Sequence, residues 1–217
     1  MKTILTLISL FSLQTCISSP APENREEAIW TPPKTEQENL KKAYFAAGCF
    51  WCVEAIFESV RGVKEVYSGY AGGQTKNPTY NQIGTGRTGH AEAVEILYDP
   101  TQVGYGTLLQ VFFGSHDPTT PNRQGPDRGT QYRSIAFYND STEREIIQNY
   151  IHLLQEKEIF SNEIVTEVKA IETFYYAEEY HQDYEKLNPT NPYVQSVSIP
   201  RLKKFQKAYP ELLKAEH

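Results

Sequence analysis

The sequence predicts a two-layer α+β domain in which helices pack on a mixed sheet. Segments with the spacing of amphipathic helices alternate with short apolar segments typical of strands, and long connections separate them. The sequence contains no internal repeat, and the irregular order of its segments argues against a regular doubly wound sheet. Roughly 175 residues remain after the N-terminal 40, enough for one domain with a sizeable core.

The first 40 residues differ in composition from the rest. Residues 1–16 contain a lysine near the start, followed by an apolar run that is too short to span a bilayer. This pattern predicts an export signal. Cys16 ends this segment as in a bacterial lipoprotein signal, and ordinary signal cleavage within residues 16–21 is the alternative. Residues 17–40, rich in Ser, Pro, Glu and Asn, are predicted to be a flexible tether. Residues 41–217 form the predicted domain, which we expect to be periplasmic or lipid-anchored to the cell envelope.

Three strands and a helix are predicted in the first half of the domain. The apolar run at 42–47 indicates a buried strand, and residues 50–60 follow with the spacing of a helix that a glycine ends. Mixed apolar and polar residues predict a second strand over 63–70, and alternation predicts a third over 91–98. Residues 69–89 show no periodic pattern, and a loop of this length in a compact domain is usually functional.

The second half begins with a helix over 105–114, which carries paired leucines and phenylalanines. Residues 115–130 are rich in turn-forming residues and are predicted to be irregular, whereas 131–138 reads as a strand. Ser141 is predicted to cap a long helix over 143–158, whose early glutamates suit its positive end. The remaining predicted elements are a strand over 164–171, one or two helical turns within 174–187 and a short helix over 199–208.

The charge of the chain argues against two classes of ligand. The formal net charge is −6, and no basic run is longer than Lys203-Lys204. Neither nucleic acid nor an anionic membrane surface is therefore expected as a ligand. No later segment has enough consecutive apolar residues to cross a membrane.

Two cysteines three residues apart are the main chemical feature. Cys49 and Cys52 follow a predicted strand and Gly48, so Cys49 is expected at the N-terminus of the next helix. Backbone N–H groups and the helix dipole there favour a thiolate. The only other cysteine, Cys16, lies in the signal, so a distant structural disulfide has no partner. Our leading hypothesis is that Cys49 is a nucleophile and Cys52 its resolving partner.

Three interpretations of this pair remain open. A zinc site would need two more ligands, and the histidines lack ligand spacing, so no metal is expected. A thioredoxin-like dithiol exchanger also places Cys-x-x-Cys at a helix start. The third is a thiol nucleophile that attacks a small oxidised or acyl substrate. Phe50 and Trp51 favour it because two exposed rings can form a pocket for a methyl or thioether group. Alternatively, these rings belong to the core.

Two acids and several tyrosines are further candidates. Glu92 and Asp127 both lie near glycines, and a carboxyl group in an apolar pocket can donate a proton to a leaving oxygen. The alternative for each is a solvated acid or the partner of an arginine. Tyr80 and Tyr132 carry hydroxyls able to bind an oxygen acceptor, although most of the fifteen tyrosines are expected to be core or surface residues.

Several motifs, in order along the chain, resemble the peptide methionine sulfoxide reductase family of the A type. They are Gly48-Cys49-Phe50-Trp51, Pro78-Thr79-Tyr80, Gly84-x-Gly86-x-Thr88-Gly89-His90-Ala91-Glu92, Asp127-Arg128-Gly129-Thr130-Gln131-Tyr132-Arg133-Ser134 and Tyr176-Ala177-Glu178-Glu179-Tyr180-His181-Gln182. The resemblance implies a two-layer α/β sandwich with a mixed central sheet, a ferredoxin-like core and long loops. It also implies reduction of methionine-S-sulfoxide, free or in oxidised proteins, as a repair reaction.

The resemblance implies a role for each matching residue. Cys49 matches the nucleophile that becomes a sulfenic acid, and Glu92 matches the acid that protonates the sulfoxide oxygen. The other matches are Tyr80 and Tyr132 as hydroxyls that hold this oxygen, Asp127 as a water- and oxygen-binding carboxylate, Phe50 and Trp51 as the cage of the methyl group, and Tyr184 as a further pocket tyrosine. No bound cofactor is implied.

Cys52 departs from the usual family pattern. Many members have glycine at this position and keep resolving cysteines in a C-terminal tail, which here contains none. The chain looks like the variant in which the Cys49 sulfenic acid condenses with Cys52 to a disulfide. An external thioredoxin-like dithiol would then reduce it. The remaining alternatives are a dithiol–disulfide exchange protein and a surface-anchored binding module without chemistry.

Overall fold

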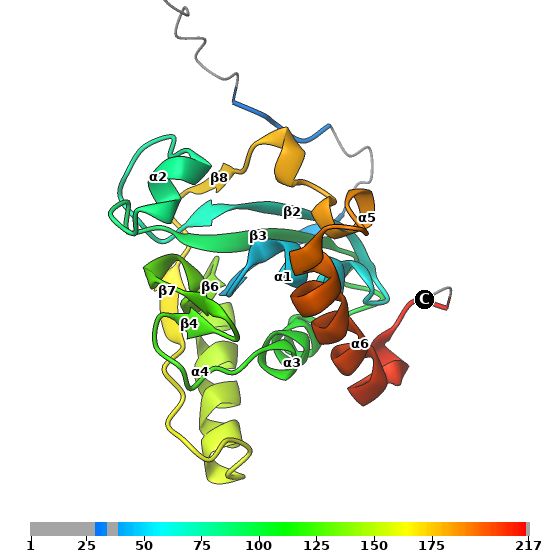
Figure 1. Ribbon diagram of the computed structural model, residues 1–217. Coiled ribbons are helices and arrows are strands. Elements are labelled where there is room, and N and C mark those ends of the chain that lie inside the picture. Colours follow the sequence, from blue (N-terminus) through cyan, green and yellow to red (C-terminus); the bar gives the residue numbers. More distant parts are fainter. Residues whose placement is uncertain (1–28, 34–38, 216–217) are drawn as a thin grey trace, which may run out of the picture.

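A mixed sheet forms the centre of the molecule. The computed structural model describes residues 29–33 and 39–215 (Figure 1). Within them, six strands pair in the order β7-β6-β1-β3-β2-β8, and all pairs are antiparallel except β6–β7. The strands are β1 (Lys41–Ala47), β2 (Val63–Ala71), β3 (Ala91–Tyr98), β6 (Ser134–Tyr138), β7 (Glu167–Ala170) and β8 (Phe174–Tyr176). A separate hairpin pairs β4 (Arg123–Gln124) with β5 (Asp127–Arg128).

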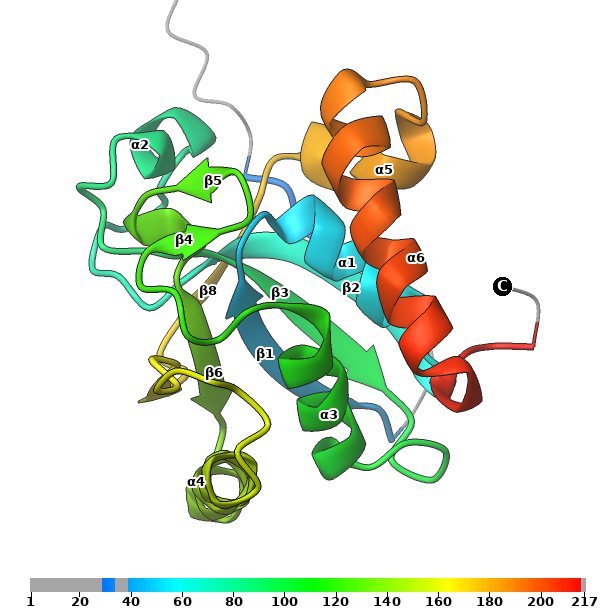
Figure 2. The ribbon, with the colours of Figure 1, turned by 60° about the horizontal axis from the view of Figure 1, so that its bottom comes forward.

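Helices cover one face of this sheet. Figure 2 shows α1, α3 and α6 side by side on that face, with the β4–β5 hairpin at one end. The helices are α1 (Phe50–Glu58), α2 (Tyr80–Gly84), α3 (Tyr105–Ser115), α4 (Ser141–Glu156), α5 (Tyr184–Leu187) and α6 (Ile199–Ala208), and a π-helical turn, Val194–Ser198, leads into α6. Across residues 29–33 and 39–215, no helix has the length and apolar character needed to cross a membrane.

The core topology confirms the predicted fold class. The segment order β1-α1-β2-β3-α3-β6 gives the spatial strand order β6-β1-β3-β2, which is the ferredoxin-like arrangement. Strands β7 and β8 extend this core at its two edges. The two-layer sandwich with a mixed sheet is therefore the observed architecture, and β1, at its centre, leads directly into the cysteine-bearing turn.

Alternation along β1 and β3 divides the side chains between the two faces. Phe45 is buried on the helical face, where its ring stacks on Phe112 at 4.8 Å and on Phe57 at 5.6 Å. Tyr44 points to the opposite face, where Phe174 covers it. Trp30, within the predicted tether, packs edge-on against Tyr176. Because both faces are covered, every residue of β3 is buried, whereas the sequence suggested simple alternation.

A buried glutamate that pairs with a half-exposed lysine stabilises the far face of β3. Glu95 accepts hydrogen bonds from the hydroxyls of Tyr44, at 2.7 Å, and Tyr176, at 2.8 Å, and it pairs with Lys42 at 3.0 Å. Glu92, three residues earlier, points to the helical face instead. Two acids of one strand thus have opposite environments, and only Glu92 faces the cysteines.

Several local predictions differ from the structure. The loop over 69–89 contains α2, which begins with a capping box between Thr79 and Gln82. Asp140, not Ser141, caps α4, because its carboxylate accepts the backbone N–H of Glu143. The strand predicted over 131–138 begins with a 3₁₀ turn, so that β6 starts at residue 134, and the strand predicted over 164–171 is reduced to β7.

Candidate active site

A glycine turn presents Cys49 at the start of α1. Gly48 has φ = +91°, and a Cβ atom placed on it would lie 2.6 Å from Cβ of Gln124 in the hairpin. Only glycine fits this turn, because both the left-handed backbone and the close contact exclude a side chain. Cys49 is the N-cap residue of α1 and is 6% exposed, whereas Cys52, one turn into the helix, is 1% exposed.

The two thiols have different electrostatic environments. Burial, the adjacent Cys52 and the carboxyl group of Glu92 raise the pKa of Cys49, and they act against the helix N-terminus. A hydrogen bond from the Cys49 thiol and the charge of Arg201 help lower the pKa of Cys52 to about 6, although burial opposes them. The hydrogen bond thus couples the two thiols, with Cys49 as its donor and Cys52 as its acceptor.

Glu92 reaches α1 from the neighbouring strand. Its Oε2 accepts the backbone N–H of Phe50 at 3.0 Å, so the acid is tied to the first turn of the helix beside Cys49. Burial raises the pKa of Glu92 to about 8, and the charge of Asp127 adds to this effect. The hydrogen bond from the Phe50 backbone N–H lowers the pKa of Glu92, but its effect is smaller than that of burial. At neutral pH the carboxyl group therefore carries a proton in an otherwise apolar environment.

Three half-buried side chains complete the polar part of the site. Tyr80 begins α2, Tyr132 ends the 3₁₀ turn before β6, and Asp127 lies in the β4–β5 hairpin. Burial and the nearby charges of Glu92, Asp127 and Cys49 raise the pKa of both tyrosines, so their hydroxyls remain protonated donors. Burial also raises the pKa of Asp127.

Tyr193 is a residue of this site that the sequence did not indicate. Its hydroxyl donates a hydrogen bond to Asp127 Oδ2 at 2.7 Å and lies 3.9 Å from Sγ of Cys52. Its ring meets Trp51 edge-on, with 6.0 Å between ring centroids. No motif surrounds it, and it lies between two predicted helical segments. The approach of the C-terminal segment to α1 is what brings it here.

An aromatic wall adjoins the cysteines. Trp51 is half-buried and stacks on Tyr184, with 3.7 Å between ring centroids. Phe50 is only 1% exposed and packs against Tyr80 and His181. The prediction of two exposed rings is therefore wrong for Phe50, which belongs to the core as well as to this wall.

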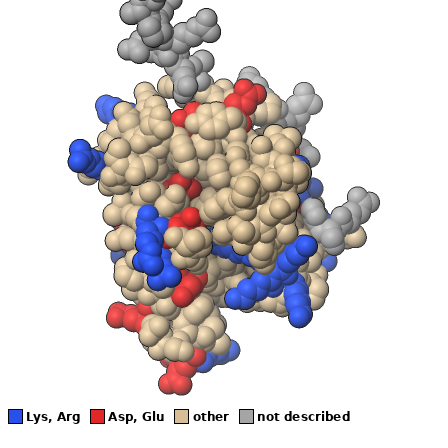
Figure 3. All heavy atoms as spheres, in the orientation of Figure 1, with Lys and Arg blue, Asp and Glu red and all other residues tan. Residues whose placement is uncertain are grey.

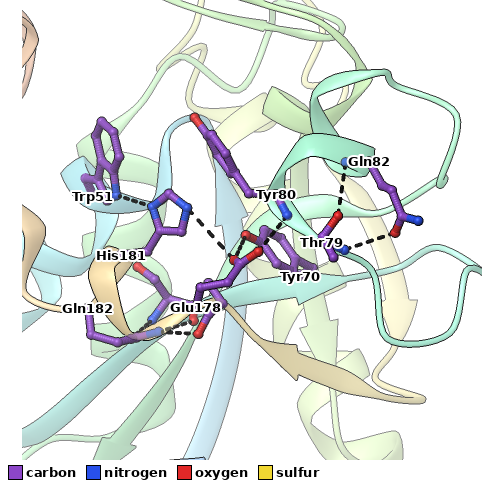
Figure 4. Close-up of polar contacts among 10 residues, drawn as sticks. Trp51, Tyr70, Thr79, Tyr80, Gln82, Glu178, His181 and Gln182 are labelled. Atoms are coloured by element: carbon purple, nitrogen blue, oxygen red, sulfur yellow. Dashed lines mark hydrogen bonds and ion pairs between the residues drawn. The ribbon is translucent and has the colours of Figure 1, made fainter. Parts of the chain in front are cut away.

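Hydrogen bonds at His181 and Glu178 hold residues of the aromatic wall and of the polar site in place (Figure 4). The indole N–H of Trp51 donates to Nδ1 of His181 at 3.1 Å, so the ring proton of a neutral His181 resides on Nε2. Burial lowers the pKa of His181 to about 4, which keeps it neutral. Glu178 accepts the backbone N–H of Tyr80 at 2.9 Å and the hydroxyl of Tyr70 at 2.8 Å. His181 thus orients the indole of Trp51, and Glu178 holds the backbone of Tyr80.

No metal centre accompanies these residues. Within residues 29–33 and 39–215, no group of three or more His, Cys, Asp or Glu side chains is placed to hold a metal ion. The site therefore offers a dithiol, a protonated buried acid, tyrosine hydroxyls and an aromatic wall. This combination suits a thiol reaction on a small substrate that carries an oxygen and an apolar group.

Comparison with known proteins identifies the family. The profile of the family described as peptide methionine sulfoxide reductase matches residues 41–213. The chain belongs to this family. Peptide methionine sulfoxide reductase MsrA 2 of Synechocystis is 48% identical over 186 residues, covering 85% of this chain and 87% of that protein. MsrA of Natronomonas pharaonis is 50% identical over 169 residues, covering 78% and 95%.

Solved structures of this family share the fold. Mxr1 of Saccharomyces cerevisiae in its reduced form matches with a TM-score of 0.67 at 33% identity, covering 73% of this chain and 91% of that one. Methionine sulfoxide reductase A of Corynebacterium diphtheriae matches with a TM-score of 0.64 at 38% identity, covering 72% and 78%. The predicted family is confirmed, and the chain is an oxidoreductase that reduces methionine sulfoxide in a thiol-dependent repair reaction.

The structure brings most of the predicted site residues together. Around the start of α1 lie Cys49, Phe50, Trp51, Cys52, Glu92, Tyr80, Asp127 and Tyr132. Tyr184 lies against Trp51 rather than beside the cysteines. Cys16 falls outside the described residues. Glu178 and His181 were part of a matched motif, but neither residue was assigned a role from the sequence.

Replacing His181 with leucine should weaken substrate binding. The change removes the acceptor of the Trp51 indole, a hydrogen bond worth about 1 kcal/mol, so kcat/KM for the sulfoxide should fall about two- to tenfold. Most of the loss should appear in KM, measured by steady-state kinetics. His152→Leu, on the exposed face of α4, is the matched control. A loss of stability without a change in KM would show that His181 only supports the fold.

Proposed function

We propose that this protein reduces the S epimer of methionine sulfoxide, free and in oxidised proteins, through a sulfenic acid on Cys49 and a Cys49–Cys52 disulfide. One observation carries the proposal. The hydrogen bond from Phe50 to Glu92 sets a protonated acid beside the nucleophilic sulfur at the start of one helix. A sulfoxide needs both groups at once, because its sulfur is attacked while its oxygen is protonated.

The surrounding side chains suit the other parts of this substrate. The Tyr80 and Tyr132 hydroxyls remain donors and hold the sulfoxide oxygen, and Asp127 binds water or that oxygen. Trp51 and Phe50 form the apolar wall for the methyl group. An oxygen and a methyl group bound on different sides fix the handedness of the sulfur, which accounts for selection of one epimer.

The chemistry proceeds without a bound cofactor. Cys49 Sγ attacks the sulfoxide sulfur while its proton passes to the hydrogen-bonded Cys52 sulfur, and Glu92 protonates the oxygen. Methionine leaves as a neutral thioether, and Cys49 keeps the oxygen as a sulfenic acid. The Cys52 sulfur then attacks the Cys49 sulfur, and the proton that Cys52 gives up leaves with the sulfenic hydroxyl as water. In sum, one sulfoxide and two thiols give one thioether, one disulfide and one water.

An external thioredoxin-like dithiol is the proposed reductant of the disulfide. Among the residues that the structure describes, Cys49 and Cys52 are the two cysteines, and both are consumed in each turnover. Thiol–disulfide exchange with a second protein restores them. The partners of this enzyme are therefore its sulfoxide substrates and a thioredoxin-like reductase on the same side of the membrane.

Single-turnover chemistry separates the roles of the two cysteines. Without added reductant, Cys52→Ser should release about one equivalent of methionine per enzyme and retain the sulfenic acid, whereas Cys49→Ser should release none. Methionine is measured by chromatography and the sulfenic acid by dimedone labelling, with each sulfoxide epimer tested alone. Reaction of the R epimer at an equal rate would overturn the proposed selectivity.

The same variants test the competing function. A dithiol–disulfide exchange protein would reduce insulin disulfides and would release no methionine from either epimer. Methionine release from the wild-type chain also excludes a binding module without chemistry. Insulin reduction at a rate comparable to sulfoxide turnover would contradict the proposal.

Glu92 should give the reaction a characteristic pH dependence. The acid donates a proton only below its pKa of about 8, so the rate of methionine release should decline as pH rises beyond this value. In Glu92→Gln the amide cannot donate an acidic proton, so the rate should fall about 10²–10⁴-fold and lose this decline. Stopped-flow or quenched-flow rates between pH 6 and 10 provide the measurement. A wild-type rate that stays constant through this range would exclude Glu92 as the acid.

We further propose that the protein is exported and held at the cell envelope by a lipid on Cys16. The charged start, the apolar run and the position of Cys16 support this location. Cys16→Ala should move the protein from the membrane fraction to the soluble fraction after cell lysis, and Ser19→Ala serves as the control. An unchanged distribution would favour ordinary signal cleavage.

A further inference from the structure

The C-terminal segment surrounds the sulfur of Cys52. Tyr193 places its hydroxyl 3.9 Å from this sulfur, and the buried Ser198 hydroxyl contacts both Cys52 and Glu185. Arg201, on the first turn of α6, completes the surroundings. Cys52 is thereby covered by one continuous stretch of chain, whereas Cys49 faces Glu92 and the half-buried tyrosines.

Arg201 is held rigidly behind the cysteine turn. Its Nη2 donates to the carbonyl oxygen of Ala47 at 2.9 Å, and its Nε donates to that of Ser115 at 2.8 Å. Its Nη1 lies 3.6 Å from the position that a Cβ on Gly48 would occupy. Both acceptors are neutral carbonyls, and the positive charge of the guanidinium acts on the Asp127 carboxyl as well as on Cys52. Lys203 and Lys204, farther along the same helix, are exposed, and Figure 3 shows Lys and Arg side chains gathered over α6.

We propose that reduction of the disulfide has a fixed direction, in which the reductant attacks Cys49 and Cys52 departs as a thiolate stabilised by the charge of Arg201. This inference rests on the proposed Cys49–Cys52 disulfide. Access supports the direction, because Cys49 keeps 6% of its surface exposed, whereas Cys52 keeps 1% and is in contact with Tyr193 and Ser198.

Charge supports the same direction. A thiolate leaves faster when its pKa is lower, and the Arg201 charge lowers the pKa of Cys52. The other titratable groups beside Cys52 are Cys49, Glu92 and Tyr193. Glu92 is neutral below about pH 8 and Tyr193 stays protonated, so Arg201 is the cation that opposes the developing charge. Arg201 acts through Cys52 and is therefore a positioning residue.

The exchange balances as two thiol–disulfide steps. The reductant thiolate attacks Cys49 Sγ, the S–S bond breaks, and its electron pair moves to Cys52 Sγ. A mixed disulfide then joins the reductant to Cys49. The second thiolate of the reductant attacks the reductant sulfur of this mixed disulfide, and Cys49 leaves and takes up a proton. The reductant loses two electrons, which the enzyme disulfide gains.

Trapping the mixed disulfide tests the direction. The full-length chain with Cys16→Ser is oxidised with diamide, so that disulfide formation does not depend on turnover. It is mixed with a thioredoxin whose second active-site cysteine is replaced by serine, and the reaction is quenched with acid during the first turnover. Peptide mass spectrometry should find the thioredoxin linked to Cys49. Linkage to Cys52 would overturn the direction, whereas failure of methionine release would instead refute the proposed function.

Kinetics of reduction test the part played by Arg201. With dithiothreitol, which needs no protein docking, Arg201→Gln should slow reduction of the disulfide about three- to tenfold, because the leaving thiolate is more basic. Arg201→Lys should restore most of the rate, and Lys203→Gln is the matched control for loss of one charge from α6. In the Cys49→Ser background, Arg201→Gln should also move the pH profile of the ultraviolet thiolate absorbance of Cys52 to higher pH.

A second substitution keeps the test decisive if Arg201→Gln does not fold. Arg201→Met keeps the length of the side chain but removes its charge, and it should slow dithiothreitol reduction in the same direction, with folding checked by circular dichroism. Rates and thiolate titrations equal to those of Lys203→Gln would overturn the proposed stabilisation of Cys52.

Discussion

The hydrogen bond between the backbone N–H of Phe50 and the carboxyl group of Glu92 joins the two layers of the molecule at its reactive centre. It connects the first turn of a helix to the central strand of the sheet, so nucleophile and acid move as one unit. Both ends are buried, and the surrounding core excludes the water that would otherwise compete for this bond. The proton on Glu92 and the position of Cys49 therefore have a common structural cause.

The remaining groups reach this centre on separate elements, each with its own anchor. Glu178 holds the start of α2 through the backbone of Tyr80, and His181 holds the indole of Trp51. Tyr193 joins the hairpin acid Asp127 to the C-terminal segment. Functional side chains on loops are thus fixed by buried hydrogen bonds to partners far away in sequence. This is how long irregular connections retain a defined geometry.

The sequence predicted the main strands and helices because their apolar periodicity is strong. It also predicted the cysteine turn, since a strand, a glycine and a helix follow one another. The sequence did not predict which strands pair or in what register. The pairing of Phe45 with Val94 is what places Glu92 beside the end of β1. Tyr193 and Arg201 were missed for the same reason, because no local pattern encodes how α6 docks on α1. The helix α2, by contrast, had a readable signal in the Thr79–Gln82 capping box.

Gly48 has no side chain and does not contact the substrate, yet it determines where the reactive groups lie. Its missing Cβ lets Gln124 lie directly on the turn, which seats the hairpin that carries Asp127. A larger residue there would displace nucleophile and hairpin together, so an alanine scan would score position 48 like a catalytic residue. A large loss of activity on mutation in this protein can therefore arise from a lost backbone contact, and does not by itself identify a residue that takes part in the reaction.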